Sequence, residues 1–191
     1  MGVAILAGPS GSGKSHLAAR LGWTVLRLDD FYREANEPDM PRSSLGIGDW
    51  DDVESWNAIA AVTAIKQLCV DGVTEVPVYD IAASARTGSR TLTLTSDRFI
   101  AEGLFAPAIV DVCREAGMLD AAICLRRNRM ITFGLRLARD LREGRKAPWV
   151  LVRRGWRLMK DEPRIIADAV AHGCEPMTPR RARRMLLGLG S

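Results

Sequence analysis

Short apolar runs alternate with longer segments of helical periodicity along most of the chain. Apolar runs of about four to eight residues are typical of buried strands, whereas apolar residues three or four positions apart are typical of amphipathic helices. The pattern predicts strands at residues 3–7, 24–30, 98–105 and 121–127, and helices at residues 14–21, 51–72, 107–116 and 128–144. Because strands that alternate with helices favour a parallel sheet, we expect an α/β fold, with an open, mostly parallel sheet and helices on both faces.

Two of the helices are predicted together with the side chains that they bury. The helix within residues 51–72 is expected to stop at Gly72, and its apolar stripe comprises Trp56, Ile59, Ala60, Thr63 and Leu68. The helix at residues 128–144 has Arg-rich sides and the apolar stripe Met130, Phe133, Leu137 and Leu141. Residues 75–80 and 90–96 are expected to form a short strand pair. After Pro148 we expect a helix, a short strand around residues 174–177 and a terminal basic helix.

The length and composition indicate a single soluble domain, residues 1–191. A chain of 191 residues can bury one core and is too short for two ordinary domains. No apolar run approaches the roughly 18 residues that a membrane span needs, and the apolar start lacks the basic leading region of a signal peptide. The four cysteines are scattered without a C-x-x-C pair. We therefore expect free thiols, no zinc site, no membrane partner and a cytoplasmic protein.

The net charge of +4 conceals a strong asymmetry along the chain. Residues 1–125 carry 10 Lys and Arg against 17 Asp and Glu, whereas residues 126–191 carry 17 against 6. A basic C-terminal third suits a nucleic acid, an acidic membrane or a polyphosphate, and a solvated helical face also accounts for it. Because no recognisable nucleic-acid-binding module appears, a nucleic-acid partner is not expected.

The clearest motif follows the first predicted strand. Gly8, Gly13, Lys14 and Ser15 satisfy G-x-x-x-x-G-K-[ST], between a strand and a helix. Glycines let backbone N–H groups surround phosphate oxygens, Lys14 supplies a charge for the β and γ phosphates, and Ser15 offers a hydroxyl to Mg²⁺. The residues expected to bind the nucleotide are Gly8, Ser10, Gly11, Ser12, Gly13, Lys14, Ser15 and His16. The motif predicts a P-loop NTPase fold that binds ATP and Mg²⁺.

Three classes of P-loop protein are considered: a small-molecule kinase, a GTPase-like switch and a nucleotide-binding module without turnover. A GTPase carries N-K-x-D and D-x-x-G motifs, and the sequence has neither. A kinase needs a group that takes the proton of the acceptor hydroxyl, and Asp29 is the candidate because it follows the second predicted strand. An Asp pair that only shapes a turn is the alternative for Asp29 and Asp30.

Beyond the loop, the chain resembles the uridine kinase family of P-loop nucleoside kinases. Residues 29–32 are similar to the family's D-S-F-Y, and "DWDDVESW" at 49–56 is similar to N-F-D-H-P-x-A-F. Residues 77–86 are similar to its P-x-Y-D-F segment that ends in Arg, and residues 102–103 correspond to its E-G strand end. "RLARDLREGR" at 136–145 resembles its lid helix, within a lid segment at about 128–147. These blocks follow the family's order and span about residues 3–146.

The resemblance implies a role for each matched residue. Asp29 would be the base toward a ribose 5′-hydroxyl and would lie near Mg²⁺, and Glu102 would join Ser15 at the metal. Residues expected to bind the acceptor are Asp51 and Arg136 at the ribose diol, Trp50 and Tyr79 beside the base, and Tyr32 and Arg86. Packing is the alternative for Trp50, and a structural carboxylate is the alternative for Glu102.

The Arg-rich helix is expected to act as a lid over the triphosphate. Arg136 and Arg139 are three positions apart and can project in similar directions, and Arg139 is expected to meet the charge on the transferred phosphoryl group. Local pairing, Arg136 with Asp140 and Arg139 with Glu143, is the alternative. Compared with the family, the lid is one residue shorter and lacks the arginine that precedes the family's Gly-Arg. Arg142 or Lys146 is the candidate to replace that arginine. Ser84 stands where the family has a base-contacting His, and Val53 replaces a Pro.

The sequence thus predicts a Mg²⁺-dependent kinase that moves the γ-phosphoryl group of ATP onto a primary hydroxyl. The resemblance favours the 5′-hydroxyl of a uridine-like nucleoside. The alternatives are another small alcohol, such as pantothenate, a sugar or a different riboside, and an ATP-binding protein without turnover. The oligomeric state is not predicted.

Overall fold

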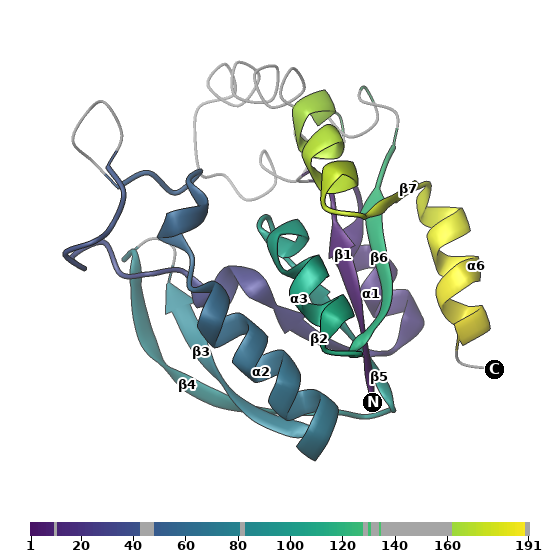
Figure 1. Ribbon diagram of the computed structural model, residues 1–191, viewed down its shortest axis with the longest axis horizontal. Helices are drawn as coiled ribbons and strands as arrows, with labels where there is room; N and C mark the ends of the chain where they lie inside the picture. Colours follow the sequence, from purple (N-terminus) through teal and green to yellow (C-terminus); the bar gives the residue numbers. More distant parts are fainter. Residues whose placement is uncertain are drawn as a thin grey trace.

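The computed structural model has an open parallel sheet at its centre (Figure 1). It describes residues 1–9, 11–42, 48–80, 83–127, 130, 134 and 162–189. Within these residues the sheet contains five strands in the order β2-β5-β1-β6-β7, and all neighbours are parallel. The strands are β2 (Thr24–Arg27), β5 (Arg98–Glu102), β1 (Gly2–Ala7), β6 (Leu119–Leu125) and β7 (Glu175–Met177). The predicted fold class is confirmed.

The strand register brings several strand ends to one edge of the sheet. Leu6 of β1 lies beside Glu102 of β5, and Glu102 lies beside Arg27 of β2. On the other side, Ala7 lies beside Cys124 of β6. Since ligands of open parallel sheets bind at the carboxyl ends of the strands, this edge is where a site is expected.

Helices cover both faces of the sheet because β1 is apolar on both sides (Figure 1). Ala4 and Leu6 face the core made with α1 (Lys14–Leu21) and α6 (Pro179–Leu189). The alternate residues of β1 face a second core, made with α2 (Ala58–Asp71), η3 (Ala106–Ile109) and α3 (Val110–Glu115). Every residue of β1 is buried, which explains its uninterrupted apolar run.

A two-stranded antiparallel sheet, β3 (Val73–Asp80) and β4 (Ala85–Thr93), lies beside α2 and apart from the main sheet (Figure 1). The sequence predicted this pair. However, β4 begins at Ala85, five residues earlier than expected, because its polar residues pair with β3 as far as Asp80. The longer pair extends the hairpin to the segment that follows β2.

The apolar stripe predicted for α2 is only partly correct. Asn57 caps the helix by accepting the N–H of Ala60, and Gly72 ends it in a left-handed conformation, as expected. The residues that α2 buries are Ala61, Ala64, Ile65 and Leu68. Ile59 is 83% exposed. Small alanines allow α2 to pack closely on the sheet, so the buried face is set by packing and not by the largest apolar residues.

The second predicted strand is shorter than expected. β2 ends at Arg27, and residues Leu28–Phe31 form the 3-10 helix η1. The adjacent carboxylates Asp29 and Asp30 favour a turn over an extended strand. At the C-terminus, residues 162–171 are helical and β7 and α6 match the predicted strand and basic helix. The helix predicted at 128–144 lies outside the described residues except for Met130 and Gly134, as do its stripe residues Phe133, Leu137 and Leu141.

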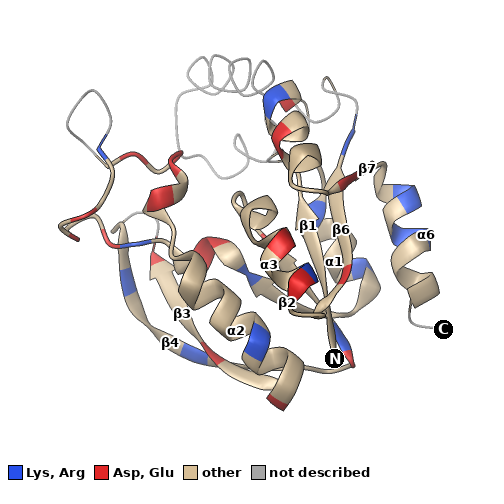
Figure 2. Ribbon diagram, viewed as in Figure 1, with Lys and Arg blue, Asp and Glu red and all other residues tan. Residues whose placement is uncertain are grey.

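Charges are distributed unevenly over the described residues (Figure 2). Arginines gather on α6, where Arg180, Arg181 and Arg184 are exposed, and acidic residues gather around η2 (Val53–Ser55). In the described part of the chain, no helix is both long and apolar enough to cross a membrane. All four cysteines are free, and burial raises the pKa of each thiol.

Candidate functional site

The glycine-rich loop connects the end of β1 to the start of α1. Gly8, Gly11 and Gly13 all adopt positive φ. At Gly8, with φ of 126°, a Cβ atom would lie 2.7 Å from the carbonyl oxygen of Leu125, so a side chain there is excluded by both conformation and space. No side chain of the described residues caps the start of α1. The N–H groups of its first turn are therefore available to an anion.

Ser12 lies inside this loop and is completely buried. Its hydroxyl has no hydrogen-bond partner among the described residues. A buried hydroxyl without a partner costs roughly 1–3 kcal/mol, and a bound phosphate group would satisfy it. The loop residues that the structure describes therefore fit a nucleotide phosphate. Ser10, also expected to bind the nucleotide, lies outside the described residues.

Lys14 at the start of α1 folds back across the loop. Its Nζ donates hydrogen bonds to the carbonyl oxygens of Gly8, at 2.7 Å, and Pro9, at 3.4 Å. These carbonyls hold a positive charge over the loop, in reach of phosphates that enter it. The next residue but one, His16, is exposed on α1.

Ser15 and Glu102 meet at the same edge of the sheet, from α1 and the end of β5. The Ser15 hydroxyl donates a hydrogen bond to the Glu102 carboxylate at 2.9 Å. Mg²⁺ prefers oxygen ligands and usually keeps several waters, with nucleotide phosphates among its ligands. Among the described residues, no group of three or more His, Cys, Asp and Glu side chains could hold a metal ion. The pair therefore fits a metal that is completed by phosphates and water.

Asp29 projects from η1 toward the end of β5. It is exposed, and its Oδ1 accepts a hydrogen bond from the backbone N–H of Leu104 at 3.0 Å. Gly103 permits this contact, because a Cβ atom there would lie 2.8 Å from both Asp29 Oδ1 and Leu28 Cβ. One oxygen of Asp29 is thus anchored to backbone. Its carboxylate lies at the end of β5, where Leu104 is close in sequence to Glu102. Glu102 in turn lies beside β1, which leads into the glycine-rich loop.

The adjacent Asp30 has the opposite environment. It is only 7% exposed, and its carboxylate lies 3.8 Å from the guanidinium groups of both Arg27 and Arg90. Burial raises the pKa of Asp30, and the two arginines oppose that rise. Within η1, one carboxylate therefore faces the candidate site and the other faces the hairpin. From the sequence, Asp30 was expected at most to shape a turn together with Asp29.

Aromatic residues form a cluster beside Asp29. The ring of Tyr32 has its centroid 5.7 Å from that of Trp50, 5.9 Å from that of Tyr79 and 5.9 Å from that of Phe105. Trp50 and Tyr79 are 6.2 Å apart in an edge-to-face arrangement. The three predicted aromatic residues are thus brought together. Phe105 was missed, since its only signal was its position just after the E-G strand end.

Two candidate carboxylates act on the Tyr32 hydroxyl. Burial raises the pKa of Tyr32, and the negative charges of Asp29 and Asp51 raise it further. Asp51 is exposed in the loop that follows Trp50. Asp29 and Asp51 therefore each lie within electrostatic reach of the Tyr32 hydroxyl.

The tip of the hairpin is tied to the segment that follows η1. The Tyr79 hydroxyl donates to the carbonyl of Arg33 at 2.9 Å, and the N–H of Ala35 donates to the carbonyl of Ser84 at 3.1 Å. Burial, together with the carboxylates of Glu34 and Glu37, raises the pKa of Tyr79 to about 12. These contacts set the place of Tyr79 beside Trp50.

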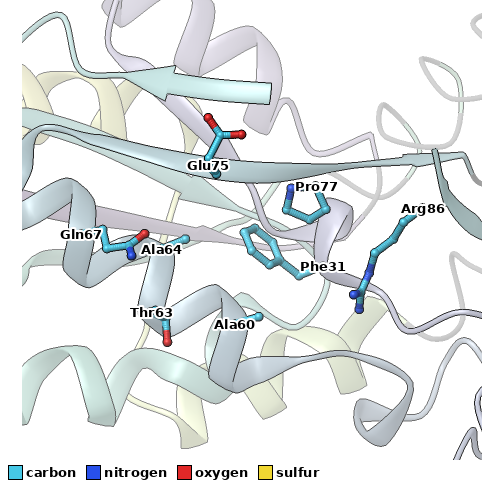
Figure 3. Close-up of a pocket in the computed structure, with 8 residues that line it drawn as sticks. All are labelled: Phe31, Ala60, Thr63, Ala64, Gln67, Glu75, Pro77 and Arg86. Carbon is cyan, nitrogen blue, oxygen red and sulfur yellow. The ribbon is translucent and has the colours of Figure 1, made fainter. Parts of the chain in front are cut away.

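Arg86 contacts the segment that follows η1. Its guanidinium donates to the carbonyl of Tyr32 at 3.5 Å and lies 3.8 Å from the Glu37 carboxylate. It also lines a cleft of about 270 Å³ between α2 and β3, together with Phe31 and Pro77 (Figure 3). This cleft contains none of the residues of the glycine-rich loop. We therefore assign the phosphate chemistry to the strand edge and not to the cleft.

The two lid arginines of the sequence analysis, Arg136 and Arg139, lie outside the described residues, as do Arg142 and Lys146. The described site thus consists of the glycine-rich loop, Ser15 with Glu102, the exposed Asp29 and the aromatic cluster around Tyr32.

Neither a family model nor a curated protein sequence matches the chain. Among solved structures, one described as a "putative fructose transport system kinase" from Silicibacter sp. TM1040 aligns over 87% of this chain and 84% of its own, with a TM-score of 0.60 and 18% identity. The chain shares the α/β fold of this structure, with a mostly parallel central sheet and helices on its faces. A "Possible Uridine Kinase" from Bacillus stearothermophilus is 24% identical over 69% of this chain and 74% of its own, with a TM-score of 0.49.

Proposed function

We propose that the chain is a Mg²⁺-dependent kinase that transfers the γ-phosphoryl group of ATP to a hydroxyl group of a small molecule. One observation carries the proposal. The register of β1, β5 and β2 puts the glycine-rich loop, the Ser15–Glu102 pair and the exposed Asp29 at one strand edge. A phosphate cradle, an oxygen pair for a metal and a carboxylate for an alcohol are the groups that phosphoryl transfer requires.

On the donor side, the loop N–H groups and the Ser12 hydroxyl would bind phosphate oxygens. Lys14 would leave the Gly8 carbonyl and place its ammonium charge on the β and γ phosphates. Ser15 and Glu102 would hold Mg²⁺, which when bound neutralises charge on the phosphate oxygens.

On the acceptor side, Asp29 would act through its second carboxylate oxygen. Oδ1 is anchored on the Leu104 N–H. Oδ2 would accept the proton of the acceptor hydroxyl while the hydroxyl oxygen of the acceptor attacks the γ-phosphorus. Arg139, and Arg136 at the substrate, remain proposed lid residues on the basis of the sequence resemblance alone.

The first candidate acceptor is a uridine-like nucleoside, phosphorylated at its 5′-hydroxyl. Its support is the series of blocks that resembles the uridine kinase family, and the gathering of Tyr32, Trp50 and Tyr79 near Asp51. In this arrangement Asp51 would accept hydrogen bonds from a vicinal diol.

The second candidate acceptor is a smaller alcohol without a base, such as a sugar. Two observations favour it. The rings of Tyr32, Trp50 and Tyr79 pack against one another at centroid distances of 5.7–6.2 Å, which leaves no gap for a base between them. Ser84 also replaces the base-contacting His, and its backbone is bound to Ala35.

The test is release of ADP by the purified chain with Mg²⁺ and ATP, measured with a panel of alcohols. Stimulation by uridine or cytidine supports the first candidate, and stimulation only by sugars, pantothenate or other small alcohols supports the second. If no acceptor stimulates ADP release while ATP still raises the melting temperature, the chain is an ATP-binding protein without turnover, and the proposal is wrong.

A further inference from the structure

Asp30 is a buried carboxylate that the proposed reaction does not use. It points from η1 toward two arginines, Arg27 at the end of β2 and Arg90 in the middle of β4. Arg90 lies opposite Val76 in the hairpin register. Since β2 belongs to the main sheet and β4 to the hairpin, the carboxylate of Asp30 connects the two sheets through η1.

A buried charge of this kind is not explained by stability alone. Moving a carboxylate out of water costs several kcal/mol, and two ion pairs at 3.8 Å recover only part of that cost. The charge of Asp30 therefore calls for another reason.

The contacts of η1 supply that reason. On one side of Asp30, Asp29 is anchored to the Leu104 N–H, and the carbonyl of Leu28 accepts a hydrogen bond from the buried indole of Trp56 at 2.7 Å. On the other side, Phe31 lines the cleft between α2 and β3 (Figure 3). η1 thus lies between the strand end that carries Asp29 and the hairpin, which also contacts β2 separately where the Thr24 hydroxyl donates to the carbonyl of Thr93 at 3.4 Å.

We propose that Asp30 is a positioning residue, which through Arg27 and Arg90 sets the position of the Asp29 carboxylate relative to the hairpin that carries Tyr79. The effect on catalysis rests on the proposed kinase function. The geometric effect does not, because the position of Asp29 can be observed without any reaction.

The first test is a kinetic comparison of Asp30→Asn and Arg90→Gln with the unaltered chain. A small misplacement of a catalytic group can cost as much as about 100-fold in rate. We expect each variant to lower kcat/KM for the acceptor by about tenfold to 100-fold, with the KM for ATP changed less than about twofold. The double variant should lose little more than either single one, because both remove the same connection.

A matched control is Asp120→Asn. Asp120, at the start of β6, forms a 3.0 Å ion pair with Arg98, at the start of β5, whereas Asp29 contacts Leu104 just beyond the other end of β5. The Asp120→Asn substitution removes a carboxylate from an ion pair without changing η1. The kcat/KM for the acceptor and the KM for ATP should both remain unchanged. Loss of acceptor kcat/KM in this control as well would mean that the variants act through general destabilisation, and the proposal would be wrong.

The second test needs no acceptor, so it separates this proposal from the kinase function. Hydrogen exchange of the Leu104 amide and the Trp56 indole N–H, followed by NMR, reports the two bonds that hold η1. We expect both protons to exchange faster in Asp30→Asn and in Arg90→Gln. In Asp120→Asn their exchange rates should equal those of the unaltered chain. Unchanged exchange overturns the proposal, even in a chain that proves to have no kinase activity.

The proposal can still be tested if one of the variants does not fold. If Asp30→Asn fails to fold, Arg90→Gln decides, because the Arg90 side chain is 41% exposed and its replacement leaves no cavity in the core. An Arg90→Gln protein with unchanged exchange at Leu104 overturns the proposal, and faster exchange supports it.

Discussion

The two sides of the candidate site are built differently. The donor side is one continuous segment, in which β1 leads through the glycine-rich loop into α1, with β1 wholly buried between its neighbours. The acceptor side is assembled from η1, the loop at Trp50 and the β3–β4 hairpin, which are distant in sequence. Local chain geometry can build a phosphate cradle, whereas the proposed acceptor side depends on contacts between segments. Changes on the acceptor side should therefore alter which alcohol is bound without affecting ATP.

The largest expected effect separates the two sides through their charged residues. Asp29→Asn should lower kcat about 10²- to 10⁴-fold by removing the base, with ATP binding nearly unchanged. Lys14→Met should instead weaken ATP binding, by about tenfold to 100-fold, because it removes a charge-assisted contact with phosphate. Single-turnover kinetics and calorimetric titration with a nonhydrolysable ATP analogue measure the two quantities. Survival of transfer in Asp29→Asn would refute the base assignment.

The next effect concerns the metal. Glu102→Gln and Ser15→Ala should each raise the Mg²⁺ concentration needed for half-maximal activity by about tenfold to 100-fold, since each removes an oxygen from the proposed site. The measurement is a Mg²⁺ titration at saturating ATP. Asp29→Asn serves as the comparison, and a shift confined to Asp29→Asn would show that the metal lies on the acceptor side instead.

A smaller effect tests how the hairpin tip is held. Tyr79→Phe keeps the ring and removes the hydroxyl that donates to the Arg33 carbonyl. The free energy of unfolding should therefore fall by about 1 kcal/mol. The KM for the acceptor should rise, while the KM for ATP stays constant. Urea unfolding and steady-state kinetics check both expectations. An equal rise in both KM values would mean that the two sides are not independent.

The smallest effect is a pH dependence of stability that comes from Asp30. Burial raises its folded pKa above 3.8, opposed by Arg27 and Arg90 and reinforced by Asp29. The folded chain thus holds this proton to higher pH than the unfolded chain. The contribution of Asp30 is fully present below 3.8 and is lost as pH rises through its folded pKa. Urea unfolding at several pH values should show wild type losing stability relative to Asp30→Asn over that interval. A constant difference would contradict it.

Features encoded by neighbouring residues could be predicted well from the sequence. The glycine-rich loop, the parallel α/β order, the Gly72 stop of α2 and the final strand and basic helix all follow from local pattern and turn chemistry. The pairing of Ser15 with Glu102 was expected only through the family resemblance. The two residues are 87 positions apart, and their contact depends on β5 lying next to β1.

The amino-acid sequence by itself determined the donor side, because a phosphate cradle needs only a strand, glycines and a helix in succession. Tertiary structure decided which of Asp29 and Asp30 faces the site, since the direction of each side chain follows from a 3-10 turn that packs against β5 and the hairpin. It likewise decided the buried face of α2 and the inward position of Phe105. Such choices depend on which surfaces meet across the fold, and residue pattern along one segment does not contain that information.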